Sequence, residues 1–241
     1  MAQQITFYDL EQASDGIDKY VRPITYEETK PFLLGIHYAR RMPCITNAFG
    51  LFVSEELVGV VTYGVPASRP LCIGLAGIEN ERNVLELNRL CIKPELNGGG
   101  RNYASFLVSH SLKLLPCGTF VVSYADTAWS HVGYVYQACN FLYTGMSAKR
   151  LDTYQPNGLH PRAYDKDNHS DLMQTRSRKH RYVYLVGDKR TKKRMRQELR
   201  YPVYDHYPKG NEQHYDVNNP QIINEIRIVE RATKQKEAKI C

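Results

Sequence analysis

The stretch VVSYADTAWSH, residues 121–131, places several hydrogen-bonding side chains at the end of an apolar segment. Ser123 and Tyr124 supply hydroxyl groups, Asp126 a carboxylate and His131 an imidazole. A carboxylate and an imidazole can both transfer protons when the protein adjusts their pKa values. Open α/β sheets bind ligands at the carboxyl ends of their strands, so this pattern predicts a ligand site. A Ser–His–Asp hydrolase is not indicated, because the sequence has no GxSxG nucleophile elbow.

A second pair of candidates, His37 and Tyr38, lies near the end of a predicted helix. The pKa of histidine is close to neutrality, so His37 can act as a general base. A single histidine is more often a helix cap or a surface residue. The sequence leaves both interpretations open.

Arg89 is the third candidate, within the stretch VLELNRLCIK at residues 84–93. A guanidinium group inside a sheet needs a partner, which Glu86, Asp126 or an anionic substrate can supply. Arg89 shares a face of the sheet with Leu87 or lies beside Glu86, depending on the register and on any bulge. A structural salt bridge and a catalytic role are both consistent with this position.

The segment PELNGGGRN, residues 94–102, follows that strand and precedes a predicted helix. Successive backbone N–H groups, the helix N-terminus and Arg101 would form an anion site suited to a pyrophosphate. The segment lacks the Lys–Ser/Thr pair of a P-loop and the GxGxxG pattern of dinucleotide-binding folds. A flexible turn at Gly98, Gly99 and Gly100 is the competing interpretation.

Hydrophobic periodicity, caps and turn residues predict the elements that position these side chains. The predicted helices are residues 25–40, interrupted by Pro31 and Gly35, then 102–116, 131–142 and the basic stretch 189–200. The predicted strands are a hairpin of residues 49–54 and 57–66, followed by 84–93, 120–126, 142–148 and 181–188. Residues 152–175 read as irregular, and the tail from Tyr201 as extended.

This order predicts an α/β (α+β) protein with a mixed central sheet flanked by helices. A strand, a glycine loop, a long helix, a strand and another helix is the arrangement of the GCN5-related N-acetyltransferase (GNAT) superfamily. In that superfamily the fourth strand hydrogen-bonds the pantetheine arm of CoA, and the loop binds its pyrophosphate. We therefore expect a GNAT-like core at residues 1–150 and a basic extension at 151–241, in which the strand 181–188 completes the sheet.

The positive charge of the chain is concentrated near its C-terminal end. The net charge is +7, and residues 176–200 alone carry eleven Lys and Arg against Asp188 and Glu198. Such a segment suits a polyanion such as nucleic acid, and a solvated helix face is the alternative. No apolar run could span a bilayer, and the first 20 residues lack a secretory signal, so we expect a cytoplasmic protein. The six cysteines form no CxxC pair, which favours free thiols and no metal site.

Three stretches together resemble the phage Mom family of DNA modification enzymes. They are ELNRLCI with RNYASFL, then VVSYADTAWSHVGYVYQACNFLYTG, then SRKHRYVYLVGDK with YPKG, within roughly residues 30–210. The resemblance implies a GNAT-like fold. It also implies conversion of adenine in DNA to N6-carbamoylmethyladenine, which protects phage DNA from host restriction.

The residue patterns and the resemblance together give three groups of site candidates. The catalytic candidates are His37, Tyr38, Arg89, Ser123, Tyr124 and Asp126, with Asp126 or His37 as the base. The cofactor-binding candidates are Leu90, Ile92, Gly98, Gly99, Gly100, Arg101, Asn102 and Ser105. The nucleic-acid-binding candidates are His131, Tyr136, Asn140, Arg178, Lys179, Arg181, Lys192, Lys193 and Arg194.

The implied partner is double-stranded DNA with an adenine flipped out of the helix. Ser123 or Asn140 would hold the edge of the base, and Tyr38, Tyr124 or Tyr136 would stack on its ring. The donor is unknown: an acyl-CoA and a related activated glycine or acetyl-type donor are the candidates. If the chain is phage-encoded, it acts in the cytoplasm of the host cell.

Two other functions fit parts of the same pattern. A GNAT enzyme that acylates a small amine or a protein would bind CoA and act without DNA. A non-catalytic nucleic-acid-binding protein would use the polar strand end only as a surface. The modification enzyme is favoured because it accounts for the basic segment and the polar strand end together.

Overall fold

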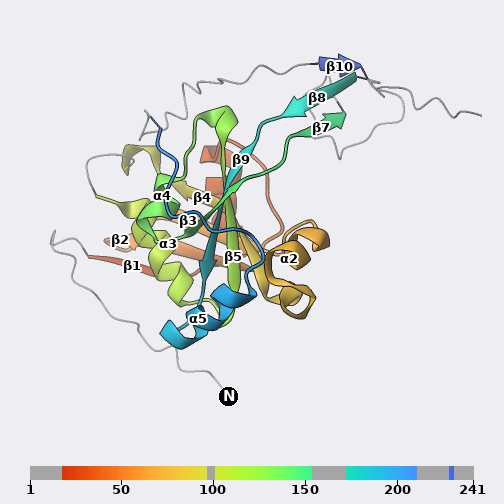
Figure 1. Ribbon diagram of the computed structural model, residues 1–241. Coiled ribbons are helices and arrows are strands. Elements are labelled where there is room, and N and C mark those ends of the chain that lie inside the picture. The colour runs from red at the N-terminus through yellow and green to blue at the C-terminus, as the bar shows by residue number, and fades with distance from the viewer. Residues whose placement is uncertain (1–17, 97–100, 154–171, 211–227, 231–241) are drawn as a thin grey trace, which may run out of the picture.

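The computed structural model describes residues 18–96, 101–153, 172–210 and 228–230 of the chain (Figure 1). Seven strands form the main sheet in the order β1-β2-β3-β4-β5-β9-β6. Their bounds are β1 (Lys19–Pro23), β2 (Asn47–Val53), β3 (Glu56–Gly64), β4 (Val84–Ile92), β5 (Phe120–Asp126), β6 (Leu142–Met146) and β9 (Lys179–Leu185). β4 and β5 are parallel, and the other neighbours in this sheet are antiparallel. The mixed central sheet is therefore confirmed.

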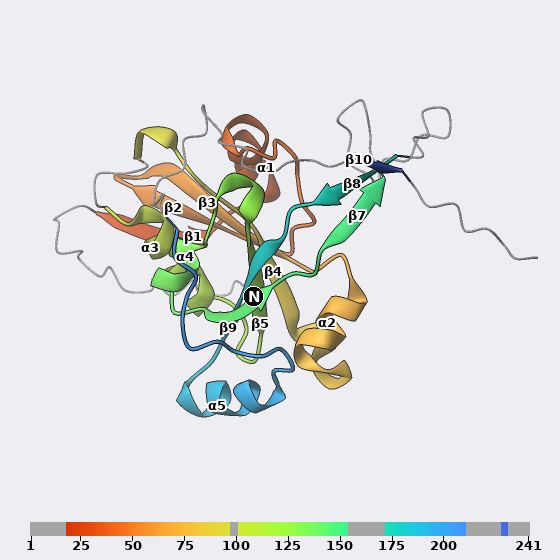
Figure 2. The ribbon, with the colours of Figure 1, turned by 45° about the horizontal axis from the view of Figure 1, so that its top comes forward.

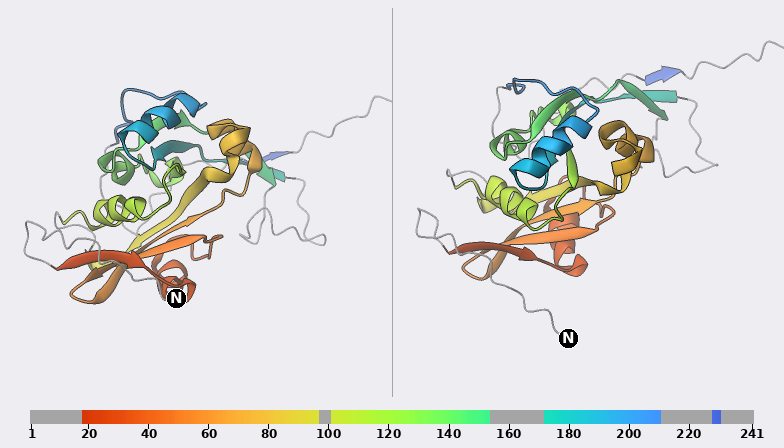
Figure 3. Two further views of the ribbon diagram at one scale, coloured as in Figure 1. Left: turned by 90° about the horizontal axis from the view of Figure 1, so that it is seen from below. Right: turned by 60° about the horizontal axis from the view of Figure 1, so that its bottom comes forward.

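Helices cover both faces of the sheet (Figure 3). On one face lie α3 (Tyr103–Lys113) and α4 (Tyr134–Ala138). On the other lie α1 (Tyr26–Lys30), the π-helix η1 (Pro31–Ile36), α2 (Arg69–Ala76) and α5 (Lys189–Glu198). Among the described residues, three short 3-10 helices also lie in the connections: η2 (Ile78–Asn83), η3 (Pro94–Leu96) and η4 (Thr127–Trp129). β4, α3, β5 and α4 follow one another in the predicted GNAT-like order.

The central strands are buried on both faces, which explains their almost continuous apolar sequences. Along β3, Val61 and Tyr63 face the core under α3, whereas Val60 faces the core under η1. All three are fully buried. Full burial of such a side chain stabilises the fold by about 1.5–3 kcal/mol.

A β-bulge in β4 resolves the position of Arg89. The pairing with β3 shifts between Thr62, which opposes Arg89, and Tyr63, which opposes Leu87, so Asn88 is the additional residue. Leu87 and Leu90 both pack in the core under α3, although two residues separate them. Arg89 therefore lies on the opposite face from Leu87, beside Glu86.

The parallel pairing of β4 with β5 is short. It joins Val84–Glu86 to Phe120–Val122 and then stops. We call the point beyond these residues the β4–β5 fork. At the fork the hydroxyl of Ser123 donates a hydrogen bond to the carbonyl oxygen of Leu87, at 3.1 Å. Side chains from both strands and from both faces of the sheet can meet here.

A second, small sheet extends beyond the main one. It consists of β7 (Arg150–Thr153), β8 (Leu172–Arg176) and β10 (Ile228–Glu230), in the order β10-β8-β7. β7 follows β6 in the chain and β8 precedes β9, so β7 and β8 form an arm that continues from the main sheet (Figures 1 and 2). The irregular structure predicted for residues 152–175 is therefore wrong at both ends of that range, while 154–171 lie outside the described residues.

Other predicted boundaries also differ from the structure. The helix predicted at 25–40 ends at Ile36, and His37 has extended backbone angles. The helix predicted at 131–142 is reduced to α4, because Gly133 has a left-handed backbone with φ +82° and Asn140 has φ +60°. β1 and α2 are not among the elements predicted from the sequence.

The bulge generates a prediction about stability. The Asn88 side chain accepts a hydrogen bond from the Thr62 hydroxyl at 2.6 Å and donates one to the Cys44 carbonyl at 2.8 Å. The Asn88→Ala substitution leaves both groups without this partner, so the free energy of unfolding should fall by roughly 1–3 kcal/mol. Denaturant unfolding measures the change. The exposed Asn83→Ala is the matched control, and equal midpoints for the two variants would contradict this account.

Candidate active site

Titratable, hydroxyl-bearing and aromatic side chains from five elements and their adjoining turns gather at the β4–β5 fork. β4 contributes Glu86 and Arg89, the end of η1 contributes His37 and Tyr38, and β5, the η4 turn and α4 contribute the remainder. The full set is His37, Tyr38, Glu86, Arg89, Ser123, Tyr124, Asp126, Trp129, His131 and Tyr136. All six catalytic candidates from the sequence belong to this set.

An aromatic surface lies on one side of the fork. The rings of His37 and Tyr38 stack with centroids 4.4 Å apart, and Tyr38 lies 5.2 Å from Trp129 and 6.5 Å from His131. Tyr38 is 42% exposed, whereas His37 is buried beneath it. η4 and the α1–η1 segment lie next to each other in Figures 1 and 2. Trp129 was not among the predicted site residues, although its place in the turn after Asp126 was a usable signal.

His37 is held in its neutral form. Burial, the charge of Arg89 and the nearby His131 lower the pKa of His37 to about 4. Its Nδ1 atom accepts a hydrogen bond from the backbone N–H of Ala39 at 3.1 Å. A neutral imidazole that accepts at Nδ1 carries its proton on Nε2. His37 is therefore a hydrogen-bond donor rather than a ready base.

Asp126 is an ionised, well-bonded carboxylate. Burial acts to raise its pKa, but Lys179, Ser177 and the N–H of Ala128 together hold the pKa of Asp126 below its ordinary value. Lys179 Nζ lies 3.0 Å from Oδ2, and the N–H of Ala128 donates to Oδ1 at 3.0 Å. These contacts cap η4 and occupy both oxygens, so Asp126 is a weak base.

Glu86 lies in a different environment. Burial raises the pKa of Glu86, with Lys179 and Arg89 acting against that shift. Within the described residues its carboxylate has no hydrogen bond and no ion pair within 4 Å. From the sequence, Glu86 is expected only as a partner for Arg89. A carboxylate with a raised pKa and free oxygens is the best-suited proton acceptor at the fork.

Arg89 has a buried hydrogen-bond donor without an acceptor in the described residues. Its NH1 atom donates to the carbonyl oxygen of Asn88 at 2.6 Å, and its Nε atom is buried without an acceptor. Burial lowers the pKa of Arg89, with Tyr38 and Glu86 opposing and Arg41 reinforcing that shift. In the described chain Arg89 forms no salt bridge with Glu86 or Asp126, the two side chains that the sequence suggested.

Tyrosines close the fork from both faces. Tyr136 packs against Phe141 and Tyr182 with centroids 5.4 Å apart in each case, and burial raises its pKa to about 12. Its hydroxyl interacts with Ser123. Tyr124 lies on the opposite face, and burial raises its pKa as well. Both tyrosines are therefore neutral packing and hydrogen-bonding groups at neutral pH.

Several nucleic-acid-binding candidates lie away from the fork. Asn140 is exposed at the end of α4, where its left-handed backbone terminates the helix. Arg181 donates to Thr144 through Nε and NH2, both at 2.9 Å, and stacks on Tyr201. Arg178 and Lys179 lie at the end of β9 that pairs with Asp126, next to the fork.

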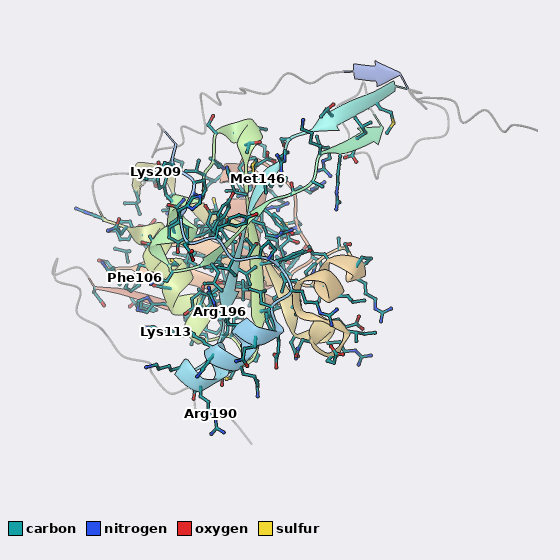
Figure 4. All side chains as sticks on the ribbon, in the orientation of Figure 1. Phe106, Lys113, Met146, Arg190, Arg196 and Lys209 are labelled. Atoms are coloured by element: carbon teal, nitrogen blue, oxygen red, sulfur yellow. The ribbon has the colours of Figure 1, made fainter. Side chains whose placement is uncertain are left out.

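The basic helix α5 lies at the other end of the molecule. It carries Lys192, Lys193 and Arg194, and it follows the end of β9 that pairs with the start of β5. Figure 4 shows Arg190 and Arg196 of this helix far from Met146, where the arm begins. Lys192 donates to the hydroxyl of Tyr184 at 3.0 Å. The basic segment 176–200 is thus divided between two distant places.

The cofactor-binding candidates follow the free edge of β4. The side chains of Leu90 and Ile92 pack in the core, and beyond Glu86 no described strand pairs with this edge. Gly98, Gly99 and Gly100 lie outside the described residues. Arg101, Asn102 and Ser105 lie at the start of α3, where the Ser105 hydroxyl donates to the Asn102 carbonyl at 2.9 Å.

In the described residues, no group of three or more His, Cys, Asp and Glu side chains is arranged to hold a metal ion. None of the helices in this part of the chain has the length and the apolar character needed to cross a bilayer.

Among solved structures, the fold is similar to N-acetyltransferases with low sequence identity. NAA60 of Arabidopsis thaliana in complex with acetyl-CoA has a TM-score of 0.47 and 15% identity, covering 70% of this chain and 98% of that chain. An N-acetyltransferase from Staphylococcus aureus Mu50 has a TM-score of 0.42 and 14% identity, covering 70% and 99%.

The sequence comparisons are more specific. A curated relative, methylcarbamoylase mom of Escherichia phage Mu, is 33% identical over 117 residues. The aligned region is 45% of this chain and 46% of that protein, so it spans less than half of the relative. The sequence also matches the Mom protein family over residues 18–209, which include β1 to β9 and α5. The chain belongs to the Mom protein family.

Proposed function

We propose that this protein transfers a carbamoylmethyl-type group to N6 of adenine in DNA. Membership of the Mom family and the similarity to the phage Mu methylcarbamoylase support a DNA-modifying transferase. The observation that carries the proposal is the β4–β5 fork. It combines a carboxylate with free oxygens, an arginine with an unused donor and an exposed aromatic surface. In a phage, the modification would protect DNA from restriction by the host.

The aromatic surface suits an extruded base. An enzyme that acts on adenine N6 must take the nucleotide out of the duplex, because base pairing and stacking cover the reacting atom. Tyr38 and Trp129 present ring faces to which the flipped adenine can stack, at about 1–3 kcal/mol per base. The Nε2–H of neutral His37 then donates to an acceptor atom of the substrate.

Glu86 is the proposed base in place of Asp126 or His37. Adenine N6 is a poor nucleophile, since its lone pair is delocalised into the ring. As the bond forms between N6 and the methylene carbon of the donor, the bond between that carbon and the leaving group breaks. The bonding electron pair departs with the leaving group, and the N6 proton passes to Glu86. A positioned carboxylate contributes about 10²–10⁴-fold to such a step.

The donor would lie along the unpaired edge of β4. Arg89 Nε and the backbone groups beyond the bulge supply the hydrogen bonds for a carbonyl or an anionic group of the donor. An acyl-CoA uses the same edge in GNAT enzymes, and a related activated glycine or acetyl-type donor has the same polar groups. The reaction above needs a donor whose leaving group is bonded to the methylene carbon, because attack on a thioester carbonyl would release the thiolate and give an N6-acyl adenine.

The proposed reaction can be tested in cells. We expect DNA from a bacterium that expresses the chain, digested to nucleosides, to contain deoxyadenosine with an added carbamoylmethyl group by mass spectrometry. Unmodified DNA in the presence of soluble, folded protein would contradict the proposal. CoA-dependent acylation of small amines without DNA would instead indicate the GNAT-type alternative.

The assignment of the base predicts an order of effects among carboxylate variants. Glu86→Gln should lower the modified fraction of adenine by about 10²–10⁴-fold, because the proton acceptor is lost. Asp126→Asn retains an acceptor oxygen for the cap of η4 and should lower it by less than about tenfold. Nucleoside mass spectrometry at matched expression compares them. The opposite order would assign the base to Asp126.

The environment of His37 predicts its titration. Its imidazole should remain neutral down to about pH 4, as followed by NMR of the ring nitrogens. The pKa is lower in the folded state than the ordinary value of 6.5, so the contribution of His37 to stability is present above pH 6.5 and declines as the pH falls towards 4. In the Arg89→Gln variant the titration midpoint of His37 should rise, because the positive charge of Arg89 helps to lower the pKa of His37. A midpoint near 6.5 in the unsubstituted protein would refute this description of the site.

A further inference from the structure

Two groups of cations lie close to the fork. The first is Arg40 and Arg41, in the loop that follows Tyr38. Arg41 is near enough to Arg89 to influence its pKa. Within the described chain the side chains of Arg40 and Arg41 have no hydrogen bond and no ion pair. Their charges are therefore available to a partner.

The second group lies at the base of the β7–β8 arm. Lys149 and Arg150 are exposed where β7 begins, and Arg150 is near enough to Tyr124 to influence its pKa. In the described residues the side chains of both are unpaired. Arg178, between β8 and β9, donates through Nε to the Ser147 carbonyl at 2.9 Å and retains its other donors.

The pairing of β7 with β8 brings two positively charged side chains together. Arg150 lies directly opposite Arg176, and like charges in this position repel. Asp152 neutralises Arg176 alone, through an ion pair of 3.0 Å between Oδ2 and Nε. The arm therefore keeps a net positive charge where it leaves the fork, and a polyanion would relieve the repulsion.

We infer that these two groups hold the phosphates next to the extruded nucleotide, and that α5 does not. The inference rests on the proposed function, because it takes the DNA strand to pass over the fork. Arg40 and Arg41 would hold phosphates next to Tyr38 and Arg89. Lys149, Arg150 and Arg178 would hold phosphates at the base of the β7–β8 arm. α5 carries more positive charge, but it lies at the opposite end of β9.

A matched pair of variants tests the inference. The fork variant, Arg41→Gln with Arg150→Gln, removes one exposed charge from each group. The α5 variant, Arg190→Gln with Arg196→Gln, removes two exposed charges from α5. Both variants lose the same charge from a chain of net charge +7. Binding to a fluorescent DNA duplex is measured by anisotropy over a range of salt concentrations. Modification of cellular DNA by the same variants is measured separately.

The fork variant should weaken DNA binding on the order of tenfold at moderate salt and reduce the slope of log K against log salt by about 2. The α5 variant should bind within about twofold of the unsubstituted protein. Equal losses in both variants, a larger loss in the α5 variant, or no loss in the fork variant would overturn the inference. So would the absence of DNA binding by the unsubstituted protein.

The two readouts separate this inference from the proposed function. DNA that is still modified while the fork variant keeps full affinity leaves the function standing and rejects the phosphate contacts. If the fork variant alone loses affinity but the unsubstituted protein leaves cellular DNA unmodified, the phosphate contacts stand and the proposed function is rejected.

Discussion

The short pairing between β4 and β5 is the constraint on which the candidate site depends. In the described residues the parallel ladder joins only Val84–Glu86 to Phe120–Val122, and the bulge at Asn88 lies just beyond it. Because the ladder stops, no described strand pairs with this edge of β4 beyond Glu86. Because of the bulge in the pairing with β3, Glu86 and Arg89 share a face next to the loop that carries His37, whereas a regular strand would place Arg89 on the same face as Leu87. The seven-stranded sheet fixes this opening in position.

The electrostatics of the fork then separates groups that look equivalent in the sequence. Glu86 and Asp126 are both partly buried carboxylates near Lys179, yet the pKa of one is raised and that of the other is lowered. Hydrogen bonds make the difference, because Asp126 accepts from Lys179, Ser177 and a backbone N–H. The same reasoning applies to His37, which burial and Arg89 keep neutral. These effects make Glu86 the proposed proton acceptor, Asp126 a fixed anion and His37 a neutral hydrogen-bond donor.

Much of the fold could be predicted from the sequence, because its central strands and long helix have strong hydrophobic patterns. The hairpin, β4, β5, α3 and the basic helix follow from such patterns, and the polar end of β5 indicated the site. The sequence could not predict which carboxylate is unpaired, since that depends on contacts between residues far apart in the chain, such as Asp126 with Lys179. Trp129 was missed because it lies in a turn without periodicity. The division of the basic segment was missed because β9 separates Lys179 from α5 by the length of the sheet.

The most direct test of the account is a crystal structure of the Glu86→Gln variant bound to a duplex that contains a target adenine. The account predicts an extruded adenine stacked against Tyr38 and Trp129, with N6 directed at residue 86 and flanking phosphates near Arg41 and Arg150. An adenine that remains paired within the duplex, or one held elsewhere on the protein, would contradict it.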